Sequence, residues 1–271
     1  MTGTERPNWH IDPQALQAYY EISGIQPISE EGAIRVQPTF GEAEGYREVF
    51  ELYDGFQLVT GDLTCHKEAV LTMRSDGSLK FHYRLEGFSG LELSDQAENR
   101  ITRYSMGVLL SPAGAKKSEH YLEGEHERSV TLICEAEFLR ARFGSHLSDL
   151  PTALENYIAT GKIASYNHRI AMNTEAIDAA RMILDTSLRG SLRRQYIEAR
   201  ALELLVLSLN ACSEHERYAD NPYHGINSRD IERMQKARLF LEQHYDSPPT
   251  ITALAREIGL NEAKLMHNFK Q

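Results

Sequence analysis

The segment SLKFHYRLEG, residues 78–87, sets the expectation for the fold of the N-terminal part of the chain. Apolar side chains alternate strictly with polar ones in this segment, which is the period of a β-strand with two different faces. Asp76-Gly77 directly before it is a hairpin signal, because this pair accepts the backbone of a tight turn. The segment therefore predicts a half-buried strand with Leu79, Phe81, Tyr83 and Leu85 toward the core and Lys80, His82, Arg84 and Glu86 on the polar side.

More short strands are expected around this segment, from about residue 47 to residue 135. Glycine or proline separates runs such as ELYDGFQLVTGDLT, RYSMGVLLSPAG and RSVTLICEAE. Many short strands at this spacing are typical of antiparallel barrels and sandwiches. We expect an α+β chain with an antiparallel β-barrel over residues 47–135 as the ligand-sensing region, preceded by an N-terminal arm over residues 1–46.

Residues 136–213 have helical periodicity, and we expect this region to be helical throughout. The long run SLRRQYIEARALELLVLSLNAC, residues 191–212, has an apolar face broader than a helix lying on one sheet needs. Two interpretations stay open, a central core helix and a helix that forms a homodimer interface. The candidate dimerisation residues are Ile197, Ala201, Leu205 and Leu209.

The polar segment 214–227 contains proline and glycine and has no periodicity, which indicates a linker. The 44 residues after it differ from the rest in charge. The whole chain has a formal net charge of −10, whereas residues 228–271 hold seven lysines and arginines against six acidic residues. Only this last region has a charge balance that tolerates the phosphate backbone of nucleic acid.

Bulk properties favour a cytoplasmic protein. No run approaches the ~18 consecutive apolar residues that a membrane-spanning helix needs. The N-terminus, MTGTERPNWHIDPQ, lacks the basic and apolar regions of a secretory signal. The three cysteines, Cys65, Cys134 and Cys212, are far apart and form no CxxC pair, which fits a reducing compartment.

The end of the chain, ITALAREIGLNEAKLMHNFK over residues 251–270, predicts a helix-turn-helix. This motif needs a small residue where the helices meet, a turn residue that tolerates positive φ and an apolar corner, and Ala255, Gly259 and Leu260 fit those needs in order. Asn261 is placed to cap the second helix, with Leu265 on its inner face. The candidate DNA-binding residues are Asn261, Glu262, Ala263, Lys264, Met266, His267 and Lys270.

The motif I-x-x-LA-x-x-x-G-(L/M)-(N/S)-x-x-(K/Y)-L-x-x-x-F-(K/R) resembles the first helix-turn-helix of the AraC/XylS family of transcription regulators, and residues 251–270 fit every keyed position. Less specifically, SLKFHYRLEGFSGLEL and RQYIEARALELLVLSL resemble the sensor domains of siderophore-responsive members. The resemblance implies a cupin-like sensor barrel, a homodimer, binding of double-stranded DNA, contact with RNA polymerase as an activator, and a small-molecule effector such as a metal–siderophore chelate.

One departure from the family pattern concerns the C-terminal region. Family DNA-binding domains contain two helix-turn-helix units, and this sequence contains the first only. We therefore expect weak DNA binding by this chain, because fewer phosphate contacts lower the affinity steeply. An alternative interpretation is a shortened regulator that interferes with a full-length one by dimerisation.

A small-molecule-binding, cupin-like enzyme is the alternative from another class. Such metal enzymes need clustered ligands, and His66, His82, His120 and His126 are scattered without an H-x-H pair. We expect no catalytic residues, no metal site and no cofactor. The candidate ligand-binding residues are Met73, Phe81, Tyr83 and Met106 inside the barrel, with Trp9 in the arm. For Arg74 and Arg84, pairing with an anionic ligand and plain surface charge both remain open.

Overall fold

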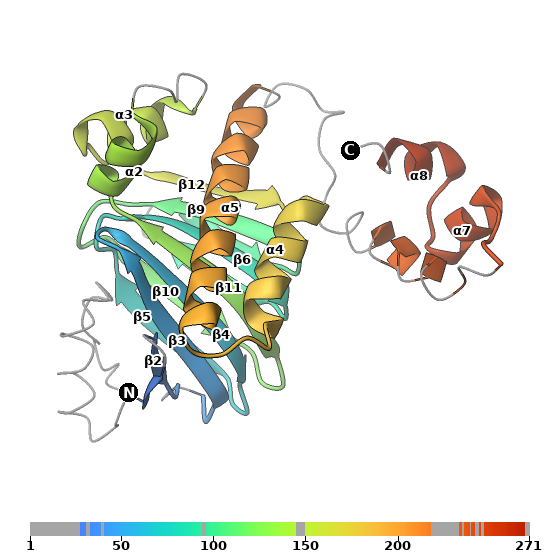
Figure 1. Cartoon of the computed structure of the whole chain (residues 1–271), viewed down its shortest axis with the longest axis horizontal. Coiled ribbons are helices and arrows are strands. Elements are labelled where there is room, and N and C mark those ends of the chain that lie inside the picture. Colours follow the sequence, from blue (N-terminus) through green and yellow to red (C-terminus); the bar gives the residue numbers. More distant parts are fainter. Residues whose placement is uncertain are drawn as a thin grey trace.

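The computed structural model describes residues 28–30, 33–38, 41–93, 96–144, 150–217, 233–234, 236–238, 240–241, 244 and 247–268. Trp9, in the predicted N-terminal arm, and Lys270, in the predicted recognition helix, lie outside the described residues. The part of the chain before residue 218 combines two β-sheets with helices, which confirms the expected α+β class (Figure 1).

The twelve described strands form two antiparallel sheets. The large sheet has the order β1-β2-β3-β4-β11-β6-β9-β12, and the small sheet has the order β5-β10-β7-β8. The strands of the large sheet are β1 (Ile28–Glu30), β2 (Ala33–Val36), β3 (Glu44–Tyr53), β4 (Phe56–Thr64), β6 (Leu79–Glu86), β9 (Ser105–Leu110), β11 (His126–Cys134) and β12 (Tyr166–Ala171). Those of the small sheet are β5 (Ala69–Arg74), β7 (Ser89–Leu93), β8 (Gln96–Ile101) and β10 (Lys116–Tyr121).

The strands expected as a β-barrel are arranged as two antiparallel sheets, and the described part of the chain shows no closed barrel. Within the described residues no strand ladder joins the two sheets, so the strands form a two-layer sandwich instead of one closed wall. Short strands with turn residues between them are common to barrels and sandwiches, and local sequence does not distinguish which strands pair at the edges.

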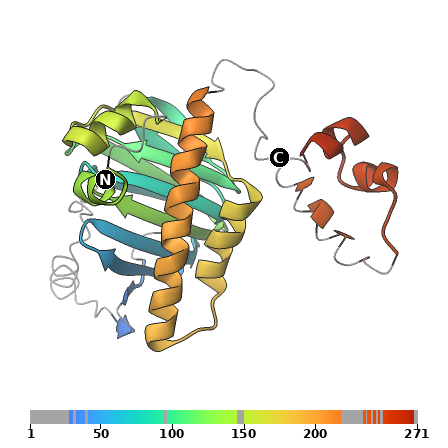
Figure 2. The same ribbon diagram turned by 45° about the horizontal axis from the view of Figure 1, so that its top comes forward.

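Helices cover one face of the large sheet. They are α2 (Ala136–Phe143), α3 (Thr152–Thr160), α4 (Thr174–Asp185) and α5 (Gly190–Arg217). In Figure 2, α5 and α4 run side by side across the strands. Asn173 caps α4 by accepting a hydrogen bond from the Ala176 amide.

Strand β12 interrupts the region that was expected to be helical throughout. It pairs antiparallel with β9, from Tyr166 opposite Leu110 to Ala171 opposite Ser105, and forms the edge of the large sheet. The helical expectation was wrong here because tertiary pairing with β9 decides the conformation of a short segment without strong helical periodicity.

The apolar face of α5 packs on the chain's own sheet. Ile197, Ala201 and Leu205 are fully buried and Leu209 is almost so, and all four belong to the core that includes Phe81 of β6. This burial is what the core-helix interpretation predicts. On the outer face of α5, Leu192 and Val206 are exposed.

Candidate functional site

Strand β6 directs its two sets of side chains into two different interiors. Leu79, Phe81 and Tyr83 are fully buried beneath the helices. Arg84, on the polar side, is also buried, with 1% of its side chain exposed, because this side faces the small sheet instead of solvent. Of the two alternatives for Arg84, plain surface charge is excluded.

Arg84 is the centre of an ion cluster between the two sheets. Its Nη2 lies 3.0 Å from Glu119 Oε1 on β10, and its Nη1 lies 3.4 Å from Glu127 Oε2 on β11. Nη2 also donates to Ser89 Oγ on β7 at 3.0 Å, and Ser89 donates to Glu119 at 2.7 Å. One guanidinium therefore connects β6 and β11 of the large sheet to β10 and β7 of the small sheet.

The Glu127 side of the cluster is also closely packed. Ser129 Oγ donates to Glu127 Oε1 at 2.5 Å, and Arg47 on β3 lies 3.9 Å from the same carboxylate oxygen. A Cβ atom at Gly61 would lie 2.9 Å from the Ser129 hydroxyl and 3.2 Å from Glu127. Glycine at this position on β4 therefore leaves the space that the pair occupies.

Burial and charge set the protonation of the cluster. Burial alone would raise the pKa of Glu119, but Arg84 and neighbouring cations more than offset it and lower the pKa to about 2. The pKa of Glu127 is lowered in the same way, by Arg84 and Arg47 against burial. Both carboxylates are thus ionised beside a guanidinium that does not deprotonate.

His82, also on the polar side of β6, lies next to this cluster. Its Nδ1 is 2.8 Å from the Thr131 hydroxyl and its Nε2 is 3.4 Å from Arg84 Nη2. Burial, together with the positive charge of Arg84, lowers the pKa of His82 to about 4. The imidazole is therefore neutral near pH 7 and acts there as a hydrogen-bonding group, not as a charge.

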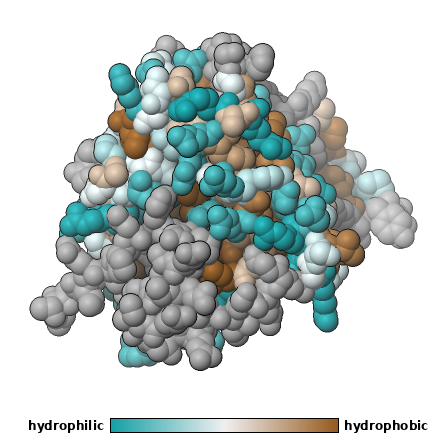
Figure 3. Space-filling model, turned by 60° about the vertical axis from the view of Figure 1, so that its left-hand side comes forward, coloured by the Kyte–Doolittle hydropathy of each residue, from teal (hydrophilic) through white to brown (hydrophobic). Residues whose placement is uncertain are grey.

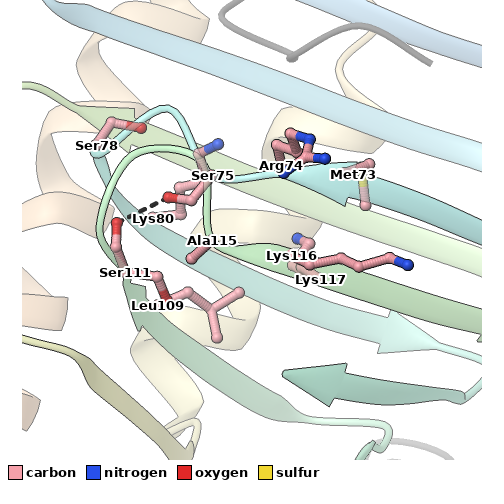
Figure 4. Close-up of a pocket in the computed structure, with 10 residues that line it drawn as sticks. All are labelled: Met73, Arg74, Ser75, Ser78, Lys80, Leu109, Ser111, Ala115, Lys116 and Lys117. Atoms are coloured by element: carbon pink, nitrogen blue, oxygen red, sulfur yellow. Dashed lines mark hydrogen bonds between the residues drawn. The ribbon is translucent and has the colours of Figure 1, made fainter. Parts of the chain in front are cut away.

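A cavity of about 50 Å³ lies at the end of the sandwich beyond this cluster, between the β5–β6 turn and the β9–β10 loop (Figure 4). Its wall combines four cationic side chains with three hydroxyls and a few apolar groups. The lining residues are Met73, Arg74, Ser75, Ser78, Lys80, Leu109, Ser111, Ala115, Lys116 and Lys117.

The candidate ligand-binding residues do not share one pocket. Met73 lines the cavity, whereas Phe81, Tyr83 and Met106 pack under the helices on the other side of the large sheet. Tyr83 Oη donates to the Leu204 carbonyl of α5 at 3.3 Å and contacts the Ser208 hydroxyl. The expectation of one apolar, aromatic-lined pocket is corrected, because the apolar side of β6 faces the helices and not the space between the sheets.

Of the three lysines in the cavity wall, the sequence predicted the position of only one. Lys80 belongs to the predicted strand, but Lys116 and Lys117 lie in a segment, residues 116–121, that no strand prediction covered. The sequence carries no period-2 signal there, since five of the six residues of KKSEHY are polar and they occupy both faces of the strand.

The C-terminal helices α7 (Ile251–Glu257) and α8 (Glu262–Asn268) have the local features of a helix-turn-helix. Ala255 is buried where the helices meet, and Gly259 in the turn has φ +68°. Asn261 caps α8 by accepting from the Lys264 amide at 2.7 Å, and Leu265 faces inward. These local predictions from the sequence are confirmed.

The candidate DNA-binding residues occupy α8 and its cap. Asn261, Glu262, Lys264 and Met266 are exposed. Ala263 and His267 belong to the same helix, though their side chains are outside the described part of the structure. Thr252 of α7 donates to Glu262 at 2.6 Å, so this carboxylate is already used to hold the two helices together.

Three general properties of the described residues concern metal binding, membrane spans and the polarity of the surface. Within the described residues, no three histidine, cysteine, aspartate or glutamate side chains gather in a way that could hold a metal ion. None of the described helices is both long enough and apolar enough to cross a membrane. On the face shown in Figure 3, hydrophilic and hydrophobic residues are interspersed.

Comparisons with known proteins identify relatives of the chain. The regulatory protein PchR of Pseudomonas aeruginosa is 32% identical over 92 residues, which are 34% of this chain and 30% of the length of that protein. Among solved structures, the AraC-like transcriptional activator CuxR is 13% identical with a TM-score of 0.41, over 95% of this chain and 83% of CuxR. ToxT from Vibrio cholerae is 11% identical with a TM-score of 0.38, over 80% of this chain and 75% of ToxT.

A family model described as the regulatory protein PchR N-terminal domain matches residues 42–222, which is more than half of the chain. The matched residues run from the strand β3 region through α5 and therefore include the ion cluster and the cavity. The family resemblance inferred from the sequence is confirmed by this match. The chain belongs to the family of the PchR N-terminal domain.

Proposed function

We propose that the chain is a ligand-responsive transcription regulator of the AraC type. Its β-sandwich senses a small molecule, and its C-terminal helix-turn-helix contacts double-stranded DNA. The observation that carries the proposal is the order of parts: a PchR-type N-terminal domain over residues 42–222 is followed by a capped helix-turn-helix over residues 251–268. A metal–siderophore chelate is the effector class that the family resemblance implies.

The DNA contact in this proposal is made by the exposed face of α8. Lys264 is an exposed cation of that face and supplies a phosphate contact, and Asn261 begins the helix that enters the major groove. Contact with RNA polymerase belongs to the same proposal, as the activator role that the family resemblance implies.

Homodimerisation is also part of the proposal, through the outer faces of α4 and α5. The four candidate residues of the inner face are occupied by the chain's own core. Exposed apolar side chains remain on the outer side of α4, of α5 and of the loop between them: Met182, Leu188, Leu192 and Val206. A symmetric dimer would remove this apolar surface from water.

Helix α5 is the element that relays ligand binding in this account. It is fixed to the sandwich near its start, where Arg193 pairs with Glu48 at 2.6 Å, and in its second half, where Ser208 contacts Tyr83. A ligand between the sheets shifts the position of the DNA-binding helices only if it binds one arrangement of α5 more tightly than another.

The experiment is selection of duplexes from a randomised library by the full chain, followed by fluorescence anisotropy on the enriched and scrambled duplexes. We expect enrichment and tighter binding of the enriched duplex than of the scrambled one, at the weak absolute affinity expected from one helix-turn-helix unit. For Lys264→Ala, the plot of the logarithm of the association constant against the logarithm of the salt concentration should become shallower, its slope changing by about one, because one phosphate contact is lost. Lys162→Ala changes an exposed lysine of the α3–β12 loop and should leave that slope unchanged. Equal affinity for both duplexes would contradict the proposed function.

A further inference from the structure

The cavity between the β5–β6 turn and the β9–β10 loop is lined by one sign of charge. Arg74, Lys80, Lys116 and Lys117 contribute to its wall, and none of its described lining residues is acidic. The nearest neutralising contact is that of Lys80, whose Nζ lies 2.7 Å from Asp76 Oδ2. The remaining cations give the cavity a positive potential that favours an anion.

Lys117 is the lysine to which an anionic ligand would supply a counter-ion. It is half-buried and points between the sheets from β10, and within the described part of the chain its ammonium makes no hydrogen bond or ion pair. The nearest carboxylate on its own strand, Glu119, is already bound to Arg84 and Ser89. Burial lowers the pKa of Lys117 to about 8, the expected consequence of taking a cation out of water without a counter-ion.

The hydrogen bonds of the two loops distinguish between classes of anion. The amides of Ser75, Gly77 and Ser78 are bonded to Ala115 O, Ser75 Oγ and Asp76 Oδ1. The amide of Gly114 is bonded to Ser75 O. These backbone donors are therefore not free to surround a phosphate, which proteins commonly hold with a set of amides.

The rest of the wall suits a group with an apolar body. Met73 and Leu109 provide apolar surface beside the ammonium groups. A cavity of about 50 Å³ has room for a headgroup of two or three heavy atoms, so the body of a larger ligand would extend along the mouth.

We propose that this cavity binds the carboxylate group of a small organic anion between Lys80 and Lys117. The inference deepens the proposed sensing role by naming the ligand chemistry and the residues that recognise it. Lys80 lies on β6 of the large sheet and Lys117 on β10 of the small sheet. The bound carboxylate thus forms a second ionic bridge between the sheets, beside the bridge that Arg84 and Glu119 form.

Isothermal titration calorimetry of the full chain without DNA tests the proposal, with benzoate, its neutral counterpart benzamide, and inorganic phosphate at matched ionic strength. We expect benzoate to bind at least about tenfold more tightly than benzamide, since charge-assisted hydrogen bonds distinguish the two. Phosphate should bind more weakly than benzoate. Equal binding of benzoate and benzamide would overturn the site, and tighter binding of phosphate would overturn the carboxylate class.

Three variants test whether benzoate binds in this cavity. Lys117→Met should weaken benzoate binding about tenfold and raise the Tm of the ligand-free chain, because it removes a half-buried charge without a counter-ion. Lys117→Arg, which keeps the charge, should retain binding within a few-fold. Ala115→Leu fills the cavity without touching a charge and should abolish binding, which keeps the test valid if Lys117→Met does not fold.

Lys67→Met on the exposed β4–β5 turn is the control and should change neither affinity nor Tm appreciably. Unchanged benzoate binding in both Lys117→Met and Ala115→Leu would overturn the proposal. Because DNA is absent, this result is independent of the duplex selection. Benzoate binding without sequence-specific DNA binding would support the carboxylate site and contradict the proposed DNA-binding function. Sequence-specific DNA binding without benzoate binding would support the proposed function and contradict the carboxylate site.

Discussion

Strand β6 has one face against the helices and one face against the small sheet, and the two faces are filled with different chemistry. Leu79, Phe81 and Tyr83 pack into a continuous apolar core with α4 and α5. Lys80, His82 and Arg84 face the second sheet, where Arg84 meets two carboxylates. Alternation along a strand therefore shows that its two faces have different surroundings, and it does not show that one of them faces water.

The difference matters for function because the two interiors have different requirements. An apolar core is stabilised by non-directional contacts and tolerates changes that conserve volume. A buried ion cluster needs every partner in place, because a single buried charge without a counter-ion is costly. The charged interior is also the one that continues into a cavity, so it is the face on which ligand recognition can be built.

The largest expected effect is on the charged face. Arg84→Met leaves Glu119 and Glu127 buried without their shared guanidinium, and we expect the free energy of unfolding to fall by about 3–5 kcal/mol. Urea denaturation measures it. The matched control is Lys67→Met, which breaks an exposed pair with Glu42 and should cost less than about 1 kcal/mol. A loss for Arg84→Met no larger than that of the control would contradict the role of the cluster.

A second test uses pH to address the same face. The folded chain holds His82 with a pKa of about 4, below the ordinary value of 6.5, so the unfolded chain binds this proton first on acidification. The free energy of unfolding should therefore fall as the pH drops from 6.5 toward 4. The other charged groups around His82 are Arg84, Glu119, Glu127 and Lys117. Glu119, with a pKa of about 2 against 4.5, adds a further loss below pH 4.5.

His82→Gln isolates the contribution of the imidazole to this pH dependence. Glutamine can keep a hydrogen bond to Thr131 but does not titrate, so the slope between pH 6.5 and 4 should become shallower. If the unfolding free energies of His82→Gln and of the unmodified chain changed in parallel with pH, the His82 imidazole would not contribute to the pH dependence.

The smallest expected effect is on the apolar face. Tyr83→Phe keeps the ring in the core and removes only the hydroxyl that contacts Ser208 and the Leu204 carbonyl of α5. We expect a loss of about 1 kcal/mol in unfolding free energy, the usual net contribution of one hydrogen bond. A loss above about 3 kcal/mol, comparable to that of Arg84→Met, would remove the contrast between the two faces.

Local features of the fold could be predicted from the sequence, and long-range features could not. The alternation in β6, the cap at Asn261 and the turn at Gly259 depend on neighbouring residues and were predicted. The partners of Arg84 lie 35 and 43 positions away on β10 and β11, so the ion cluster depends on strand pairing that local patterns do not contain.

The same reason explains the unexpected strand β12 and the division of the strands into two sheets. Strand β12 is a strand because β9 offers it an edge, and the segment itself carries no strong strand pattern. Strand spacing allowed either a barrel or a sandwich, whereas the division into two sheets depends on which edges meet. The cavity follows from both, since its wall combines side chains from β5, β6, β9 and β10 and from the loops between them.

The most direct test of the central claim, that ligand recognition occurs between the sheets and not under the helices, uses two methionines. Met73 lines the cavity, and Met106 packs in the apolar core on the opposite side of the large sheet. The chain is labelled with 13C-methyl methionine, the two signals are assigned with Met73→Leu and Met106→Leu, and benzoate is added. We expect the Met73 signal to shift in a saturable way and the Met106 signal to stay nearly unchanged. A saturable shift of Met106 with a silent Met73 would contradict that claim.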